Sequence, residues 1–572
     1  MSVRVLFADP DVEVVEDGRD VWVVSGVDTG ALRDAIGGAE TVDGTIDAVC
    51  ERAEDAVLVH VERGPSGIRA VDAYRSVVSN FALYYGRSAD GVLFLADHYR
   101  NAVAQLPAAA RTLADTAVTD HLLFRAPIEP TTYLEEIRAV AHGSWVHWGQ
   151  HATRPSVAQV DRLESDWRGG DDPVSALDEV LGAVLHRGAG GRSVTNMLSG
   201  GVDSTLLQTY LDGAPALAIE PDAPELRFEV DYAAESADLL GVRPRRVPLA
   251  EADYLDQLET SMDRLGYPSH YGLTPVVDAA FAADPGDRYV NGEGADAVFG
   301  LTGIKGFRTA LRLEPLLDSP VGGLLCGAPD PVGAYVRELS RNVAQSRRPP
   351  SHPRSFAQQF AFFTDPDLAA AIVGDDRVAA RARRQFEYVD SRLGSRPVGR
   401  YARQLETAQF MSVYHHNTVD QWRQLAYGHG KTVFAPFKTR SVASFALSVP
   451  VERRYATDHR LPGQMTVKPL PKRLLNRRLP AYDTGKPKGS GAYPRERFFE
   501  DGPLAGVFER YDPPAFVPER LYADHVERYG PLTWNLITFA VWRDRVFEND
   551  DLAPVPGTTE VRCDPRVSVD TV

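Results

Sequence analysis

The chain has 572 residues, of which 62 are Lys or Arg and 79 are Asp or Glu, giving a formal net charge of −17 at pH 7. This length exceeds that of one hydrophobic core, so we expect two or more domains. The acidic balance opposes general binding to nucleic acids or anionic membranes, so an anionic ligand would have to be held by a local cluster of donors.

The three cysteines, Cys50, Cys326 and Cys563, lie far apart and form neither a disulfide framework nor a zinc-binding spacing. The first residues contain too short an apolar stretch for a signal peptide, and no apolar run reaches the roughly 18 residues of a membrane helix. These features predict a soluble protein of the reducing cytoplasm.

The amino-terminal part, residues 1–155, contains short β-branched stretches separated by polar turns, which predicts a sheet-rich domain. The clearest predicted strands lie at 21–24, 57–61 and 92–96. Residues 160–175 are polar and rich in helix breakers. We therefore place the domain boundary near residue 155 and assign residues 156–572 to a second domain.

In the second domain, strand-like and helix-like stretches alternate, which predicts a parallel sheet with helices on both faces. The expected order is strand, helix, strand, helix at 193–198, 204–211, 216–219 and 230–240. Residues 316–356 are expected to be loop-rich, either as a mobile insertion or as a helical excursion with poorly fixed ends. Residues 532–542 are expected to form a core helix, and the tail from about residue 551 to be ordered only where it docks.

The first motif is a buried strand that runs through a Ser-Gly-Gly turn into a helix, which is typical of a phosphate-binding turn. Its glycines let the backbone approach an anion closely, and its hydroxyls add donors. A carboxylate among phosphates is explained if it holds Mg²⁺. An ordinary βα turn with an Asp or Ser cap is the alternative. The candidate nucleotide-binding residues are Leu198, Ser199, Gly200, Gly201, Asp203 and Ser204.

The second motif, at 289–300, is again a short strand that enters a glycine-rich turn. Gly292 is expected to contact the nucleotide, and Asp296 is the natural second carboxylate for a metal. Glu293 lies between two glycines on a loop, where it could act on a substrate as a general base. The alternative is a glycine turn with a solvated acid.

Lysine is scarce in this chain, since arginine supplies most of the basic residues, yet four of the seven lysines fall at 468–488. An ammonium is a compact point charge suited to phosphate, whereas a guanidinium is a planar fork. The stretch could neutralise a triphosphate, or it could be a solvated basic face.

Together these three segments resemble the synthetase domain of the asparagine synthetase and β-lactam synthetase superfamily, in which the first two motifs read SGGxDS and GEGxDE. The resemblance implies a parallel-sheet, pyrophosphatase-type domain of the adenine nucleotide alpha hydrolase kind. It also implies ATP and Mg²⁺ as cofactors, with Asp203 and Asp296 on the metal. In that family, one lysine that reaches the phosphates lies twelve residues before a Leu-Pro proline and a second lies eight residues after it. In this chain the proline is Pro480, so the resemblance selects Lys468 and Lys488 as the catalytic lysines.

The amino-terminal half of the asparagine synthetases is a glutaminase of the N-terminal-nucleophile class, a sheet sandwich whose nucleophilic cysteine follows the initiator methionine. Residues 83–103 and 131–148 resemble parts of that domain in degenerate form. Ser2 occupies the position of the nucleophile, and the glutamine-binding signatures are missing. We therefore expect a degenerate glutaminase-like domain and an amine that does not come from glutamine.

Further departures bear on the reaction. Ala297 replaces the last acid of the second motif, which leaves that acid's role in doubt, and Glu293 stands where β-lactam synthetases carry tyrosine, which disfavours β-lactam closure. A lasso-peptide macrolactam cyclase stays a competitor, although the family's PFLD segment reads Pro-Phe-Lys-Thr at 436–439. Tyr267 and His270, on a loop before the second motif, could line the acceptor pocket or simply pack.

The expected function is ATP-dependent amide bond formation by an AMP-forming carbon–nitrogen ligase. A carboxylate is adenylated, a non-glutamine amine attacks, and AMP and pyrophosphate are released, in the context of natural-product or antibiotic biosynthesis. The partners are a small-molecule or peptide carboxylate and an amine, without nucleic acid or membrane, and a homodimer is left open. A non-catalytic nucleotide-binding relic is the rival outside the enzymes.

Overall fold

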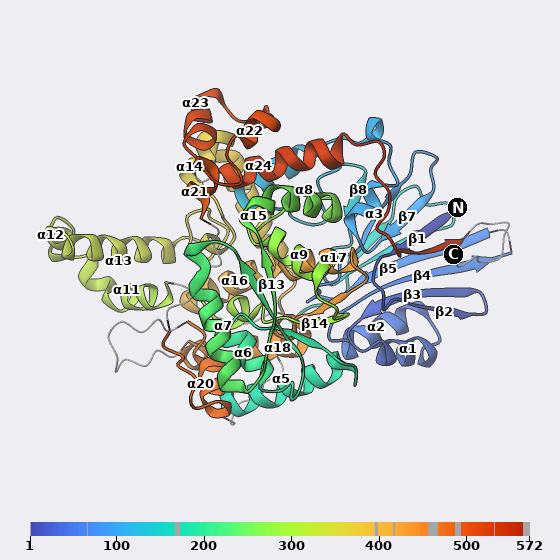
Figure 1. Ribbon diagram of the computed structural model, residues 1–572, viewed down its shortest axis with the longest axis horizontal. Helices are drawn as coiled ribbons and strands as arrows, with labels where there is room; N and C mark the ends of the chain where they lie inside the picture. The colour runs from blue at the N-terminus through green and yellow to red at the C-terminus, as the bar shows by residue number, and fades with distance from the viewer. Residues whose placement is uncertain are drawn as a thin grey trace.

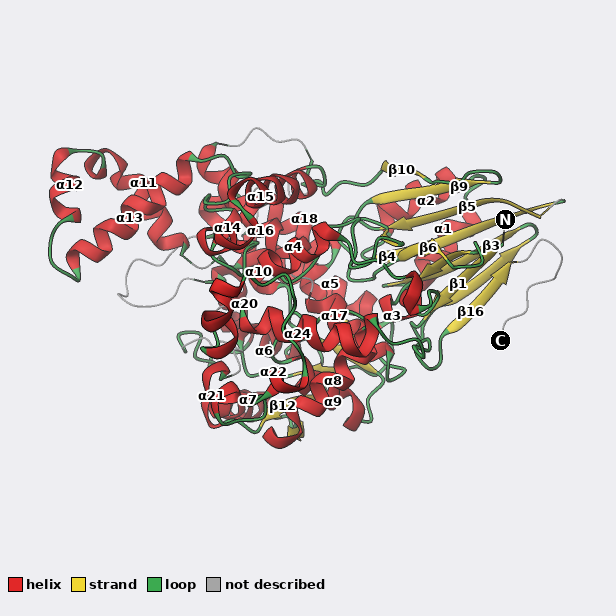
Figure 2. Ribbon diagram, turned by 90° about the horizontal axis from the view of Figure 1, so that it is seen from above, coloured by secondary structure: helices red, strands yellow, loops and turns green. Residues whose placement is uncertain are grey.

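The computed structural model describes residues 2–65, 67–165, 172–301, 303–394, 399–415, 418–455, 467–486, 494–530 and 532–563. Two parts lie side by side in Figures 1 and 2: a strand-rich part, and a helix-rich part built around a further sheet. The predicted α/β class is confirmed, with a sheet sandwich followed by a parallel-sheet domain.

The amino-terminal part is a sandwich of two sheets, whose facing strands bury alternate apolar residues such as Val23, Val59 and Trp148 between them. One sheet has the order β16-β1-β7-β6-β8 and the other β10-β9-β5-β4-β3-β2. The three predicted strands are confirmed as β3, β4 and β7. The strands are β1 (Val3–Phe7), β2 (Glu13–Asp17), β3 (Asp20–Gly26), β4 (Ala56–Gly64), β5 (Gly67–Arg75), β6 (Tyr84–Arg87), β7 (Leu93–Ala96), β8 (Ile137–Ala139), β9 (Ser144–Gly149), β10 (Ser156–Gln159) and β16 (Thr559–Cys563).

The two outer faces of the sandwich are covered differently. Helices α1 (Thr29–Gly38) and α2 (Val42–Arg52) pack on the six-stranded sheet. The five-stranded sheet instead packs on the second part of the chain, because Leu6 and Phe94 share one buried cluster with Trp542. This shared core fixes the sandwich against the second domain.

The last described strand, β16, belongs to the sandwich. It pairs antiparallel with β1, from Cys563 opposite Val3 to Thr559 opposite Phe7. The tail that begins at about residue 551 is thus ordered where it docks, because its backbone completes the edge of a sheet. The boundary predicted near 155 falls between β9 and β10, and β10 still pairs with the sandwich.

The second part is built on a five-stranded sheet in which all neighbours are parallel, in the order β13-β12-β11-β14-β15. The alternation predicted between residues 193 and 240 is confirmed as β11, α6, β12 and α7. The strands and the helix between β12 and β13 are β11 (Thr195–Met197), β12 (Ala216–Pro221), α7 (Arg227–Leu240), β13 (Arg245–Leu249), β14 (Arg288–Val290) and β15 (Thr432–Phe434).

Helices cover both faces of this sheet, because successive strand residues point in opposite directions: Val290 belongs to one buried cluster and Tyr289 to the other. The helices on the Val290 side are α5 (Pro173–Ala189), α6 (Val202–Gln208), α10 (Ala295–Phe299), α18 (Arg440–Ser448) and α20 (Pro469–Arg478). Those on the Tyr289 side include α8 (Tyr254–Leu265), α9 (Thr274–Ala283), α17 (Thr418–Tyr427) and α24 (Thr533–Trp542). Every residue of α24 is buried, which confirms the predicted core helix.

The segment at 316–356, which was expected to be loop-rich, is mostly helical, so of its two predicted forms the helical excursion is the one that the structure has. Helices α11 (Ile304–Leu317), α12 (Pro320–Cys326) and α13 (Val332–Arg347) form an arm that projects from the second part in Figure 1. Pro320 lies in the first turn of α12, where proline is tolerated, so it starts a helix instead of preventing one.

The other helices connect these layers. They are α3 (Tyr99–Val103), α4 (Asp115–Phe124), α14 (Pro366–Val373), α15 (Asp375–Asp390), α16 (Arg400–His415), α19 (Val451–Arg454), α21 (Arg495–Glu500), α22 (Val507–Arg510) and α23 (Glu519–Tyr522). None of the described helices combines the length and the apolar character that crossing a lipid bilayer requires.

Candidate active site

Two loops leave the carboxyl ends of neighbouring parallel strands in the second sheet. The first loop, residues 198–204, follows β11, and the second loop, residues 291–296, follows β14. Strands β12 and β13 lie on one side of β11, whereas β14 and β15 lie on the other. The strand order therefore reverses between β11 and β14, and such reversals open a crevice where α/β sheets bind ligands.

The first loop is held by its own hydroxyls. The Ser199 amide donates to Ser204 Oγ at 3.1 Å, and the hydroxyl oxygens of Ser199 and Ser204 lie 3.0 Å apart. Leu198 is buried, and its amide donates to the Leu217 carbonyl at 2.8 Å, which anchors the loop to β12. Gly201 then caps α6. The loop therefore joins the end of β11 to the start of α6, which is the strand-turn-helix context predicted for a phosphate-binding turn.

Gly200 is required by the packing of this loop. Its φ is +73°, and a Cβ added there would lie 2.1 Å from the Tyr232 carbonyl carbon of α7. The Gly200 carbonyl accepts hydrogen bonds from the Tyr482 hydroxyl at 2.7 Å and from the Ser236 hydroxyl at 3.2 Å. The loop backbone is therefore pressed against a helix on one side and fixed by two donors.

Gly200→Ala is expected to reduce the free energy of unfolding by more than about 2 kcal/mol, because it adds a backbone clash to an unfavourable positive φ. Chemical denaturation measures the change. Gly213→Ala is the matched control, since Gly213 has a φ of +68° but nothing within 4 Å of the added Cβ. Equal losses in the two variants would contradict the close approach to α7.

The second loop lies directly against the first. A Cβ added to Gly292 would be 3.0 Å from both Asp203 Cβ and the Ser204 amide nitrogen, so a side chain there would require the first loop to shift by a few tenths of an ångström. The Asn291 amide donates to the Phe434 carbonyl at 2.9 Å, and the Asn291 side-chain oxygen accepts from the Glu293 amide at 2.6 Å. These bonds hold Glu293 half-buried at the carboxyl edge of the sheet.

Lys468 joins the two loops. Its Nζ lies 2.5 Å from Asp203 Oδ2 and 3.0 Å from Asp296 Oδ1. Burial opposes the charge on this side chain, but the two carboxylates outweigh burial and raise the pKa of Lys468 above its ordinary value. Lys468 is the residue directly before α20 and has a left-handed backbone conformation, with a φ of 58°. From this position its side chain reaches Asp203 on the first loop and Asp296 on the second. It is therefore a fixed, charged donor.

Asp203 and Asp296 also fit a divalent cation. Both carboxylates reach one Nζ, so their oxygens converge on a common point, and oxygen is the donor that Mg²⁺ prefers. The described residues contain no group of three or more His, Cys, Asp or Glu that could hold a metal by itself. Two carboxylates completed by phosphate oxygens are a usual set for Mg²⁺, which when bound would supply positive charge against a triphosphate.

Sequence reasoning missed Lys438. It follows β15, and a Cβ added to Gly294 would lie 2.3 Å from its Cγ, so the lysine stem runs along the second loop. Burial lowers the pKa of Lys438 to about 8, while the nearby Glu293 and Asp420 carboxylates oppose the shift. The available signal was a lysine placed inside the otherwise apolar Ala-Pro-Phe run, at a position expected to be buried.

The other predicted lysine, Lys488, lies outside the described residues, so its role stays a prediction. Its neighbour Lys486 forms an ion pair with Glu235 at 2.9 Å. Lys472, one turn into α20, is half-buried, and burial together with the Lys468 charge lowers its pKa. Among the described lysines of this stretch, Lys468 alone contacts both loop carboxylates.

Comparison with known families agrees with this geometry. The sequence pattern described as asparagine synthase matches residues 176–526, which is more than half of the chain. The chain belongs to the asparagine synthase family. The match begins inside α5, includes both loops and Lys468, and ends before α24. A search of curated proteins gave no match.

Membership of the asparagine synthase family makes this chain an ATP-dependent amide ligase of the AMP-forming kind, and the family generally uses Mg²⁺ with ATP. The matched region leaves out the whole amino-terminal sandwich. The general reaction therefore belongs to the second domain.

Proposed function

We propose that the protein activates a carboxylate as its acyl-adenylate and transfers the acyl group to an amine that does not come from glutamine. The observation that carries this proposal is the meeting of Lys468 with Asp203 and Asp296 between two glycine-rich loops. A carboxylate is a poor electrophile, and adenylation turns one of its oxygens into a leaving group.

In the first step, a carboxylate oxygen bonds to the α-phosphorus of ATP, the bond to the β-phosphate oxygen breaks, and pyrophosphate leaves. The backbone and hydroxyls of the first loop bind the phosphates. Negative charge builds up on the departing pyrophosphate, and the Lys468 ammonium is already fixed beside the phosphate-binding loop. Asp203 and Asp296 would hold Mg²⁺ on the same phosphates.

In the second step, the amine nitrogen bonds to the acyl carbon, the bond to the AMP oxygen breaks, and AMP leaves. The amine must lose a proton as the bond forms. Glu293 is the candidate base, because it is half-buried on the second loop and its backbone is fixed by Asn291.

The amino-terminal domain supports an amine that does not come from glutamine. Ser2 stands where the glutaminases of this family carry cysteine. Strand β1 runs from this residue towards the second domain, where Asp11 pairs with Arg192 at 3.0 Å. The six residue steps from Ser2 to Ala8 would span about 20 Å in extended conformation, so Ser2 lies at the remote end of the sandwich. An external amine, as in natural-product biosynthesis, fits this arrangement.

The test uses hydroxylamine as a general nucleophile, because it traps acyl-adenylates as hydroxamates. With ATP, Mg²⁺ and a panel of carboxylic acids, we expect hydroxamate from at least one acid, with one AMP released per hydroxamate. Asp203→Asn should abolish both products, because it removes one ligand of the metal and one contact of Lys468. Release of ADP and phosphate would contradict adenylation.

Glutamine provides the control for the amine source. In the same mixture without hydroxylamine, we expect no release of glutamate from glutamine, and Ser2→Ala should change nothing. Glutamate release that disappears in Ser2→Ala would show a working glutaminase and would overturn this part of the proposal.

A further inference from the structure

Lys438 is a buried lysine that packs on the second loop. Its side chain and backbone together are only 3% exposed. A Cβ added to Gly294 would lie 2.3 Å from Cγ and 3.1 Å from Cδ of Lys438, so the lysine stem runs along the residue next to Glu293. The ammonium is therefore held beside the loop that carries the candidate base.

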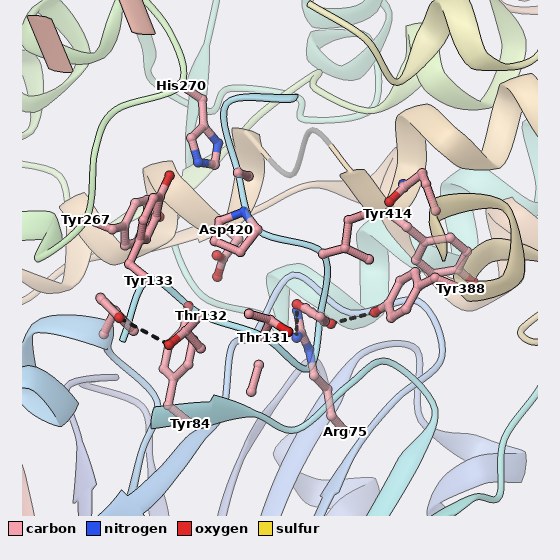
Figure 3. A pocket seen from close by; sticks show the side chains of 17 residues that line it. Arg75, Tyr84, Thr131, Thr132, Tyr133, Tyr267, His270, Tyr388, Tyr414 and Asp420 are labelled. Atoms are coloured by element: carbon pink, nitrogen blue, oxygen red, sulfur yellow. Dashed lines mark hydrogen bonds and ion pairs between the residues drawn. The ribbon is translucent and has the colours of Figure 1, made fainter. Parts of the chain in front are cut away.

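The charged groups around this ammonium come from several elements. Three carboxylates act on it: Glu293 of the second loop, Asp420 of α17 and Asp55, the residue before β4. Arg75, at the end of β5, opposes them. Asp420 and Arg75 both line a cavity between the two domains and are labelled in Figure 3. Burial lowers the pKa of Lys438 to about 8, and of the three carboxylates Glu293 opposes this shift most strongly.

The other two carboxylates have donors of their own. Asp55 accepts from the backbone and from the side chain of Asn80, at 2.9 and 3.1 Å. Asp420 accepts from the Gln424 side chain at 3.1 Å, and the positive charge of Arg75 also acts on it. The role of Lys438 is therefore best sought at Glu293.

The amino-terminal domain fixes the backbone of Lys438. The Asn80 side chain is 2% exposed and donates to the Lys438 carbonyl at 2.9 Å as well as to Asp55. Three residues further along the chain, Ser441 donates to the Glu54 side chain through its amide at 2.9 Å and its hydroxyl at 2.5 Å. The segment that links Lys438 to α18 is thus held from the sandwich side.

This arrangement matters for proton transfer. Carboxylates that lie near one another repel, and the repulsion favours the protonated form of one of them. A protonated Glu293 could not take the proton of an attacking amine. An ammonium beside it offsets the repulsion, so the carboxylate stays charged until the amine nitrogen gives up its proton to a Glu293 oxygen. Lys438 keeps its own proton throughout.

We infer that Lys438 is a positioning residue for the amine step, which keeps Glu293 ionised and in place on the second loop, and that the amino-terminal domain holds Lys438 there through Asn80. This inference rests on the proposed function, in which Glu293 is the base. It gives the sandwich a part in the reaction of the second domain.

Lys438→Met tests the role of the charge, because methionine keeps an apolar stem of similar length. Hydroxamate formation with hydroxylamine and acid-dependent pyrophosphate exchange are measured with the same acid. At about pH 6.5 we expect kcat for hydroxamate to fall about 10- to 100-fold, because loss of a nearby positive charge favours the protonated carboxyl. The KM for hydroxylamine and the rate of exchange should change less than about threefold. Equal losses in exchange and hydroxamate formation would overturn the inference.

The pH dependence distinguishes a charge effect from a packing defect. The ratio of the wild-type rate to the Lys438→Met rate should be largest at low pH and should fall as pH rises through about 8, where Lys438 loses its proton. Protonation of hydroxylamine affects both proteins equally and cancels in this ratio. A ratio that stays constant from about pH 6 to about pH 9 would contradict a role for the charge.

A double variant tests whether Lys438 acts through Glu293. In the Glu293→Gln background, Lys438→Met should cost less than about twofold more in hydroxamate formation, because no base is left to support. Losses that simply multiply would mean that Lys438 acts independently of Glu293, which would overturn the inference.

Asn80→Ala tests the part of the amino-terminal domain. It removes the donor to the Lys438 carbonyl and should lower hydroxamate formation about three- to tenfold while exchange stays unchanged. Ser441→Ala is the matched control, because it removes a hydrogen bond between the same segment and the sandwich without touching Lys438. It should leave both rates unchanged. Equal losses in the two variants would contradict positioning through Asn80.

The interaction of Lys438 with Glu293 is also measurable without turnover. The chain has seven lysines, so NMR of protein labelled with ¹³C at lysine Cε can follow Lys438, whose signal is identified by its loss in Lys438→Met. Its titration midpoint should lie at about pH 8 in the wild type and lower in Glu293→Gln, because the Glu293 charge favours the ammonium. An unchanged midpoint would overturn the inference even in an active enzyme. A shifted midpoint in a wild type without pyrophosphate exchange would contradict the proposed function alone.

Discussion

Lys468→Met is expected to lower the rate of acid-dependent pyrophosphate exchange by about 10²- to 10³-fold, with a much smaller change in the apparent affinity for ATP. The physical reason is that pyrophosphate gains charge as the acyl-adenylate forms, so a fixed ammonium stabilises the reacting state more than bound ATP. Methionine keeps the length and apolar stem of the side chain but removes the charge that contacts Asp203 and Asp296.

Lys472→Met is the matched control, because Lys472 lies four residues further along, on α20, and is half-buried. It should cost less than about threefold in rate. Equal losses in the two variants would mean that this stretch acts only as a general basic surface, and the assignment of Lys468 would fail.

A stability measurement checks the same contact without catalysis. In Lys468→Met the carboxylates of Asp203 and Asp296 face each other without the ammonium between them. Asp296 is 46% exposed, so solvent screens the repulsion and we expect a loss of about 1–3 kcal/mol in EDTA. Mg²⁺ should then raise the Tm of the variant more than that of the wild type. An equal rise would contradict a shared site for Mg²⁺.

Glu293→Gln is expected to lower amide formation by about 10²- to 10⁴-fold, the usual contribution of a general base. Glutamine keeps the shape of the side chain and leaves the Asn291 bond to the backbone amide intact, but it cannot take the amine proton. Adenylation precedes this step, so pyrophosphate exchange should persist in the variant. Both rates are measured with the same acid.

Glu235→Gln is the control for this substitution, since Glu235 pairs with Lys486 and lies outside both loops. Amide formation should stay within a few-fold of the wild type. If Glu293→Gln lost exchange and amide formation equally, Glu293 would act on the nucleotide and its assignment as the base would be wrong.

The amino-terminal sandwich has a structural role in this chain. It shares a buried core with the second domain, in which Leu6 and Phe94 pack with Trp542. Deleting the sandwich would expose the second domain's side of that core to water.

Several elements of this fold can be predicted from local sequence. The turn at 198–204 and the turn at 291–296 were predicted correctly, because glycine at a positive φ or at a close approach and a strand entering a helix are local requirements. The parallel sheet followed from the alternation of strands and helices, and the core helix Thr533–Trp542 from its unbroken apolar run. Neighbouring parallel strands then bring both turns to one edge.

Only the tertiary structure decided which distant residues meet. Lys468 is 265 residues from Asp203 in the chain, and only the start of α20 places it between the loops. Lys438 was overlooked because a lysine after an apolar run becomes significant only once the tertiary structure shows that its side chain is buried. One cavity is lined both by Arg75 of the sandwich and by Asp420 of the second domain, and β16 pairs with β1 from the other end of the chain. Such contacts depend on how layers pack, because one-dimensional periodicity shows which face of an element is buried but not what buries it.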